Sequence, residues 1–112
     1  MAVLVAAMSL ATCTSTAPPV ALARYLDGVE VQAETDSQRA ILVQALDDMF
    51  QQPPATLRAA RYGPDQRTLP ALLRAHLVPS EPIAVDDEAF YTQASDPQVR
   101  AAVGTLLQKL RR

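Results

Sequence analysis

The sequence predicts a small all-α domain of four to five short helices, to which a minor two-stranded pair can be added. The chain has 112 residues, enough for one domain. Its 49% hydrophobic and 20% charged residues are typical of a globular protein. Nine prolines divide the chain, and most apolar residues between them recur at helical spacing. We expect the helical domain to span residues 24–112.

The first long helix is predicted over about residues 37–51. Asp36 or Ser37 can cap it, because a side-chain oxygen accepts hydrogen bonds from the free amides of the first turn. Pro53-Pro54 ends it. Its apolar residues are spaced by one and four and form a single stripe: Ile41, Leu42, Ala45, Leu46, Met49 and Phe50.

Two short helices are expected next. Pro54 suits the first turn of a helix over residues 54–62. Thr68 can cap a second helix, which stops before Pro79 and contains four leucines, Leu69, Leu72, Leu73 and Leu77. Isolated helices of this length are marginal in water, so both need packing against the rest of the domain.

The C-terminal helix, predicted over residues 97–110, has the clearest start signal. Asp96 supplies a capping carboxylate, and Pro97 fits the first turn. The run from Asp96 to Leu110 resembles the second helix of a HEAT repeat, with matches at Asp96, Pro97, Val99 and Arg100. One such helix does not imply a solenoid, because a stable solenoid needs about three repeats.

Two other segments could be extended. Residues 29–33 alternate in polarity after the Asp27-Gly28 turn, and residues 83–85 are apolar. If both form strands, we expect them to pair. The acidic run 86–88 then leads into a helical turn that continues to Gln93.

The N-terminal segment differs from the rest of the chain. Residues 1–23 contain no Asp, Glu, Lys, Arg or His. An apolar run over residues 1–11 is followed by small polar residues and two prolines, which is the layout of a secretory signal. We assign residues 1–23 to a signal, lipid-anchor and tether segment.

The tetrad Leu10-Ala11-Thr12-Cys13 resembles the lipobox of bacterial lipoprotein signals. The resemblance implies cleavage just before Cys13 and a diacylglycerol on its thiol. It also implies the periplasmic side of the outer membrane, because Thr14 replaces the Asp that commonly signals inner-membrane retention in this class. Residues 14–19 suit a flexible tether.

Two alternatives remain open for this segment. Ala21-Leu22-Ala23 is an Ala-x-Ala triplet, and cleavage after it would release a soluble protein that begins at Arg24. Alternatively, residues 1–11 form a buried helix of a cytoplasmic domain, and Cys13 is a small buried thiol.

No group of residues in the sequence matches a catalytic or metal-binding motif. One His and one Cys cannot build an intrachain disulfide or a Cys/His zinc site. His76 is interpreted as a surface or capping residue, the acids Asp86, Asp87 and Glu88 as a helix cap, and Asp47-Asp48 as a solvated helix face. We expect neither enzymatic activity nor a cofactor.

Charge is segregated along the chain. The stretch between Thr56 and His76 contains only one acidic residue, Asp65. It contains four arginines, Arg58, Arg61, Arg67 and Arg74. The stretch from Glu81 to Asp96 has five acids and no base. The arginines could form a patch for an acidic partner, or they could pack against the acidic segments of the same domain.

These observations favour a non-enzymatic envelope protein that binds another protein, as an accessory or inhibitor-like subunit. Contact with a membrane would occur only through the lipid on Cys13. Nucleic acid is not an expected partner, because the net charge is −2 and few aromatic residues are present to stack bases. The alternatives are a cytoplasmic helical regulator or nucleic-acid-binding domain that uses the four arginines, and a small periplasmic enzyme that uses scattered carboxylates.

Overall fold

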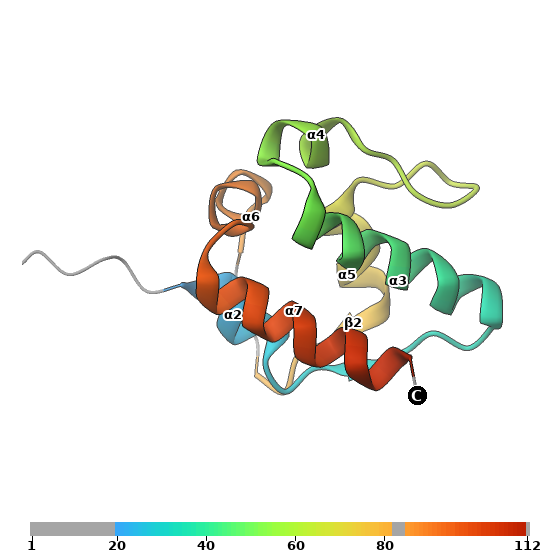
Figure 1. Ribbon diagram of the computed structural model, residues 1–112. Coiled ribbons are helices and arrows are strands. Elements are labelled where there is room, and N and C mark those ends of the chain that lie inside the picture. The colour runs from blue at the N-terminus through green and yellow to red at the C-terminus, as the bar shows by residue number, and fades with distance from the viewer. Residues whose placement is uncertain (1–19, 82–84, 112) are drawn as a thin grey trace, which may run out of the picture.

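The two longest helices are the two that the sequence predicted with full apolar stripes (Figure 1). The computed structural model describes residues 20–81 and 85–111. In this part of the chain, α3 spans Asp36–Gln51 and α7 spans Pro97–Leu110. Six helices and one two-stranded sheet are present in the described residues, which confirms the all-α class with more helices than the four to five expected. None of these helices is both long and apolar enough to cross a membrane.

Helix α3 begins with a capping box centred on Thr35. The Thr35 Oγ1 atom accepts a hydrogen bond from the Gln38 amide at 3.1 Å, and the Gln38 Oε1 atom accepts one from the Thr35 amide at 3.3 Å. The prediction of Asp36 or Ser37 as the cap was wrong by one or two positions, because a glutamine three residues after the threonine satisfies two free amides reciprocally. Asp36 lies in the first turn, where the helix dipole favours a carboxylate.

Helices α3 and α7 pack against each other and form the centre of the core. Their buried residues are Leu42, Ala45, Leu46, Met49, Val99, Val103, Leu106, Leu107 and Leu110. Gly104 lets Phe50 approach α7, since a Cβ atom at Gly104 would lie 3.3 Å from Phe50 Cζ. Arg100, also on α7, contacts the same phenylalanine. Its Nη2 donates to the Phe50 carbonyl at 2.9 Å, and its guanidinium lies 5.3 Å from the ring centroid.

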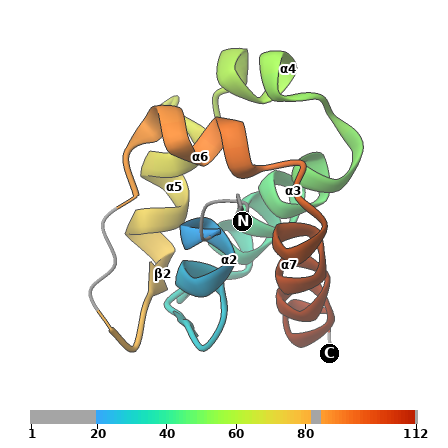
Figure 2. The ribbon, with the colours of Figure 1, turned by 90° about the vertical axis from the view of Figure 1, so that its left-hand side faces the viewer.

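Helix α2, at Ala21–Leu26, was not predicted (Figure 2). It has no side-chain cap and no acidic residue in its first turn, so tertiary packing stabilises it. Leu22 is fully buried, its amide donates to Gln93 Oε1 at 2.8 Å, and Tyr25 donates through its hydroxyl to the Leu77 carbonyl at 3.2 Å. The position between Ala23 and Arg24, which the sequence suggested as a domain boundary, lies within this helix. Residues 1–19, including Cys13, lie outside the described residues.

Two short helices end earlier than predicted. Helix α4 spans Pro54–Ala59 and stops before Tyr62, whose backbone pairs with Arg67. Helix α5 spans Leu69–His76 and is capped by Thr68, as expected. Leu77 leaves the helix and begins strand β2, Leu77–Val78.

The small sheet pairs a different set of strands from the one predicted. Strand β1, Glu30–Val31, is antiparallel to β2, with Glu30 opposite Val78 and Val31 opposite Leu77. The expected partner of residues 29–33 was the segment 83–85; residues 83 and 84 lie outside the described residues, so that pairing stays a prediction. Leu77 is buried in the core. This burial favours the pairing of β2 with β1, because the extended backbone of β2 keeps Leu77 in the core after α5 has ended.

Helix α6, at Asp87–Gln93, follows the sequence signal closely. The Asp86 Oδ1 atom accepts a hydrogen bond from the Ala89 amide at 2.8 Å, and Asp87 and Glu88 lie in the first turn. Phe90 and Tyr91 are buried on the inner face of the helix. The prediction that the acidic run caps a helix is confirmed.

Candidate functional site

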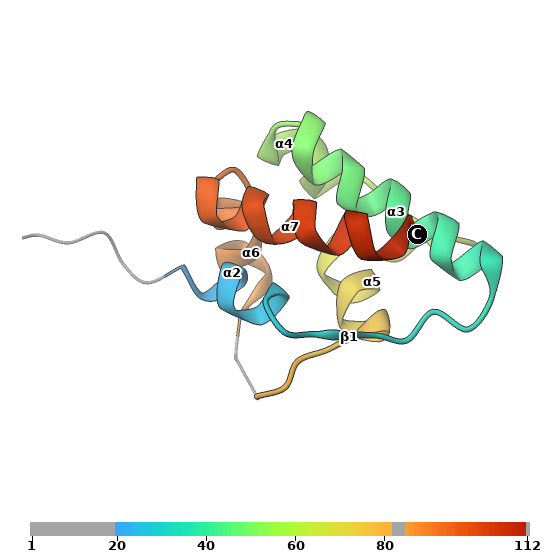
Figure 3. The same cartoon turned by 60° about the horizontal axis from the view of Figure 1, so that its bottom comes forward.

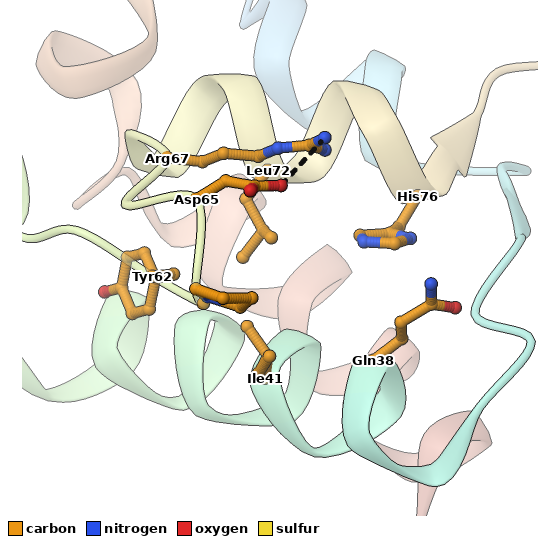
Figure 4. A pocket seen from close by; sticks show the side chains of 9 residues that line it. Gln38, Ile41, Tyr62, Asp65, Arg67, Leu72 and His76 are labelled. Carbon is orange, nitrogen blue, oxygen red and sulfur yellow. Dashed lines mark ion pairs between the residues drawn. The ribbon is translucent and has the colours of Figure 1, made fainter.

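A cavity of about 150 Å³ lies between α3, α5 and the turn formed by residues 62–67 (Figure 4). We call it the α3–α5 cavity. Ile41 and Leu72 supply its apolar part. Figure 4 shows the polar groups of Arg67, Asp65, His76 and Gln38 gathered toward one end of it. The remaining lining residues are Tyr62, Gly63 and Pro64.

The turn that forms one wall of the cavity is closed by backbone hydrogen bonds. Tyr62 and Arg67 exchange two of them, at 2.9 and 3.0 Å, and the Gln66 amide donates to the Gly63 carbonyl at 3.1 Å. Gly63 and Gln66 both adopt positive φ angles, of 74° and 54°. A glycine suits the first of these positions because it has no Cβ atom. The wall is therefore held by the backbone hydrogen bonds of the turn itself.

Tyr62 attaches this turn to α3. Its hydroxyl donates to Asp48 Oδ2 at 2.7 Å, and Gln44 Nε2 donates to Asp48 Oδ1 at 2.9 Å. Asp48 therefore has a structural role, whereas the sequence predicted only a solvated face. Its neighbour Asp47 forms an ion pair with Arg111 at 3.7 Å. Burial raises the pKa of Tyr62 far above its ordinary value, and the hydrogen bond to Asp48 raises it further.

This pKa shift predicts a loss of stability at alkaline pH. Above pH about 10 a tyrosine in the unfolded chain releases its proton, while folded Tyr62 retains it, so the free energy of unfolding falls as pH rises. One such tyrosine contributes up to about 1.4 kcal/mol per pH unit. We expect Tyr62→Phe to cost about 1 kcal/mol at neutral pH, through loss of the hydrogen bond, and to flatten the alkaline decline.

Urea unfolding of both proteins between neutral and strongly alkaline pH would measure this effect. The pKa values of Tyr25 and Tyr91 are also raised, chiefly by burial, so wild type and variant should both lose stability, with different slopes. Parallel stability curves for the two proteins would contradict the assignment to Tyr62.

His76 is bonded to the backbone of Gln32. The Gln32 amide donates to the His76 carbonyl at 2.7 Å, and His76 Nδ1 lies 3.0 Å from the Gln32 carbonyl oxygen. Because a carbonyl oxygen can only accept, Nδ1 bears a proton and donates it to this bond. The histidine therefore bonds to the segment after β1 and lines the cavity, where Figure 4 shows its ring above Gln38.

Gln38 and Arg67 supply hydrogen-bond donors to the same end of the cavity. The Gln38 Oε1 atom accepts from the amides of Glu34 and Thr35, so its amide nitrogen points the other way, toward His76 in Figure 4. Arg67 Nη2 lies 3.6 Å from Asp65 Oδ2, longer than a charge-assisted hydrogen bond. Among the residues that the structure describes, the Arg67 side chain has no other ion pair.

The four arginines of the predicted patch make different contacts. Arg58 pairs with Glu88 at 2.6 Å and lies over the Tyr91 ring, and Arg74 pairs with Asp87 at 2.7 Å. Arg61 instead donates to the carbonyls of Arg58 and Ala60, while Arg67 lines the α3–α5 cavity. For Arg58 and Arg74 the contacts match the second interpretation, in which the basic stretch packs against acidic residues of the same domain.

No pattern in the sequence pointed to the α3–α5 cavity. Two local signals were present: Thr35 and Gln38 have capping-box spacing, and Gly63-Pro64-Asp65 is typical of a turn. Neither signal indicates that the turn folds back onto α3. Within the described residues, no group of three or more His, Cys, Asp or Glu side chains could hold a metal ion.

Comparison with known proteins gives no relative. The chain matches no protein-family model, no curated protein and no solved structure.

Proposed function

We propose that the chain is a small non-enzymatic protein of the bacterial envelope, anchored through a lipid on Cys13, that binds another protein through the α3–α5 cavity. The observation that supports this most directly is the position of the cavity. Figures 1 and 3 show α2, where the described chain begins, at one end of the domain. The 62–67 turn, which forms a wall of the cavity, lies toward the opposite end in Figure 1.

This arrangement suits a tethered binding domain. Six residues separate Cys13 from Val20, so an extended tether would reach at most about 25 Å. A lipid on Cys13 would attach the α2 end of the domain to the membrane, at a distance from the cavity. The cavity would then be accessible to a partner.

Helix α2 favours Cys13 over Ala23 as the processing position. Cleavage after Ala23 would remove Leu22, which is fully buried, together with the hydrogen bond from its amide to Gln93. Cleavage before Cys13 leaves the whole of α2 in the mature protein.

The chemistry of the cavity favours binding over catalysis. Its described lining contains no Ser, Thr, Cys or Lys nucleophile, and the carboxylate of Asp65 lies 3.6 Å from the Arg67 guanidinium. The Tyr62 hydroxyl is bonded to Asp48, and Nδ1 of His76 is bonded to Gln32. The remaining polar groups are suited to hydrogen bonding with a ligand.

Fractionation of the native host tests the anchor. The wild-type protein is expected in the membrane fraction, with an N-terminal peptide that begins at Cys13 and has the mass of an acylated cysteine. Cys13→Ser should lose both properties, whereas Thr14→Ser, a matched change one residue away, should keep them. Full-length protein with an unmodified Cys13 in the cytoplasm would contradict the proposal, and a soluble form that begins at Arg24 would select the Ala-x-Ala site.

Site-specific cross-linking in the same host tests the binding function. A photoreactive residue at Asp65, on the cavity rim, is expected to trap one identifiable protein. The same residue at Gln108, an exposed position on α7, should not trap it. Equal trapping at both positions, or none at Asp65, would contradict binding through the cavity.

A further inference from the structure

We propose that α6 carries a site for the guanidinium group of an arginine on another protein, and that Arg58 of α4 occupies this site in the free domain. The site consists of the Tyr91 ring and the Glu88 carboxylate. Neither residue lines the α3–α5 cavity, so this inference goes beyond the proposed function and does not depend on it.

The contacts of Arg58 indicate which chemistry the site takes. Its Nη2 lies 2.6 Å from Glu88 Oε1, and its guanidinium carbon lies 5.2 Å from the centroid of the Tyr91 ring. Glu88 and Tyr91 are three positions apart on α6, so they are neighbours on one face of the helix. A planar guanidinium suits both groups, because its face stacks on an aromatic ring while its N–H groups donate to a carboxylate.

The carboxylate half of the site stays accessible while Arg58 occupies it. The side chains of Arg58 and Glu88 are 47% and 76% exposed. An ion pair between such exposed groups adds little net stability, because both groups are well hydrated when they separate. A second guanidinium can therefore approach Glu88 and replace Arg58 at low cost. The Tyr91 ring is buried, so this second group reaches the ring face only after Arg58 has left it.

Arg58 lies on a segment that is attached to the domain by few groups, residues 53–61, which we call the α4 flap. Among the described residues, the backbone hydrogen bonds of the flap all lie within it, as in the bond from the Leu57 amide to the Pro53 carbonyl. Helix α4 has no side-chain cap, and Leu57 is its one buried residue. It packs chiefly against α6, next to which it lies in Figure 2. Segments with so few buried contacts open at a lower free energy than the core.

The chain is anchored on both sides of the flap, so opening can be confined to it. Before it, the Gln52 amide donates to the Asp48 carbonyl at the end of α3, at 2.8 Å. After it, the Tyr62 backbone pairs with Arg67, and the Tyr62 hydroxyl donates to Asp48. The backbone is extended at Pro53 and Ala60, the two ends of α4. These two positions are suited to act as hinges.

Arg58 therefore competes with any arginine from outside. The apparent affinity of the site for an external guanidinium equals its intrinsic affinity multiplied by the fraction of molecules in which the flap is open. Removal of Arg58 makes that fraction equal to one. The proposal therefore predicts that a variant without Arg58 binds arginine more tightly than the wild-type protein does.

The test is a titration of the full 112-residue chain and of Arg58→Ala, both isotopically labelled and followed by NMR of the Tyr91 ring. The probe is the N-acetyl methylamide of arginine. Its matched control is the citrulline compound, which has a similar shape and no charge. Arg58→Ala is expected to bind the arginine probe with a Kd of about 10 mM, and wild type about tenfold more weakly. The citrulline probe should bind the variant about tenfold more weakly than arginine does.

Further variants locate the binding on α6. Glu88→Gln, added to Arg58→Ala, keeps the shape of the side chain and removes its charge, so binding should weaken about tenfold. Glu34→Gln in the same background is the matched control at an exposed residue outside α6, and it should have no effect. Arg39→Ala, which removes an exposed arginine of α3, should bind the probe like wild type. Arg58→Ala empties the site whether or not α4 stays docked, so the test does not depend on the fold of α4.

Hydrogen exchange in the wild-type protein tests the flap itself. The arginine probe should accelerate exchange of the α4 amides, because a bound probe keeps Arg58 away from α6, and the citrulline probe should not. The inference is overturned by equal binding to wild type and Arg58→Ala, by equal binding of the two probes, or by unchanged binding after Glu88→Gln. Absence of a Tyr91 shift in Arg58→Ala at the highest soluble probe concentration would also overturn it. Each of these results would leave binding through the α3–α5 cavity unaffected.

Discussion

Leu46→Ala and Leu106→Ala are each expected to lower the free energy of unfolding by about 2–5 kcal/mol. Both side chains lie in the contact between α3 and α7, and their exposed fractions are 0% and 1%. Alanine removes buried methyl groups and leaves a cavity, because the surrounding helices relax only in part. Since a small domain has a total stability of about 5–15 kcal/mol, either change should be visible in the unfolding curve.

Urea unfolding followed by far-UV circular dichroism would measure this loss. Gln108→Ala is the matched control, since Gln108 is exposed on α7, and its effect should stay within about 0.5 kcal/mol. If both leucine variants unfold at the wild-type urea concentration, the contact between the two helices is not the centre of the core.

Leu22→Ala is expected to have an effect of similar size, about 2–5 kcal/mol. Leu22 is fully buried, and α2 is a short helix without a side-chain cap. A helix of this kind depends on its packing, so loss of its central buried side chain should also release Tyr25 from Leu77. The loss of stability therefore has two sources: the void left by the missing leucine side chain and the loosening of α2.

Arg24→Ala is the control for this variant, because Arg24 is exposed on the same helix. Unfolding midpoints of the three proteins, together with hydrogen exchange of the α2 amides, give the measurement. We expect faster exchange in Leu22→Ala only. Wild-type stability and exchange in that variant would show that α2 is dispensable, and would remove the structural argument against cleavage after Ala23.

Helices with strong local signals were predicted nearly to the residue. Asp96-Pro97 marked the start of α7, and the acidic run from Asp86 marked α6. These signals are reliable because a capping side chain satisfies free backbone amides within the same few residues. The cap of α3 was missed for the same kind of reason, since Thr35 and Gln38 form a reciprocal pair that competes with the neighbouring Asp36 and Ser37.

Elements without such signals were missed or misassigned. Helix α2 has an uncharged first half, which on sequence alone resembles a cleavage region more than a core helix. Strand β2 was assigned to the preceding helix because Leu77 continues the leucine spacing of α5. Its pairing with β1 joins residues more than forty positions apart, and no local pattern specifies that contact.

The sequence by itself determined the all-α fold class and the main helices, because apolar spacing and helix caps depend on residues close together in the chain. For the N-terminal segment it defined the alternative processing sites. Only the tertiary structure decided that Arg58 and Arg74 pair with acids of α6 and that Arg67 lines a cavity. The same holds for the cavity itself, which joins Gln38 and Ile41 to the 62–67 turn and to His76. Its geometry arises from the Tyr62–Asp48 hydrogen bond and the contacts of His76 with Gln32, interactions between groups that only folding brings within hydrogen-bond distance.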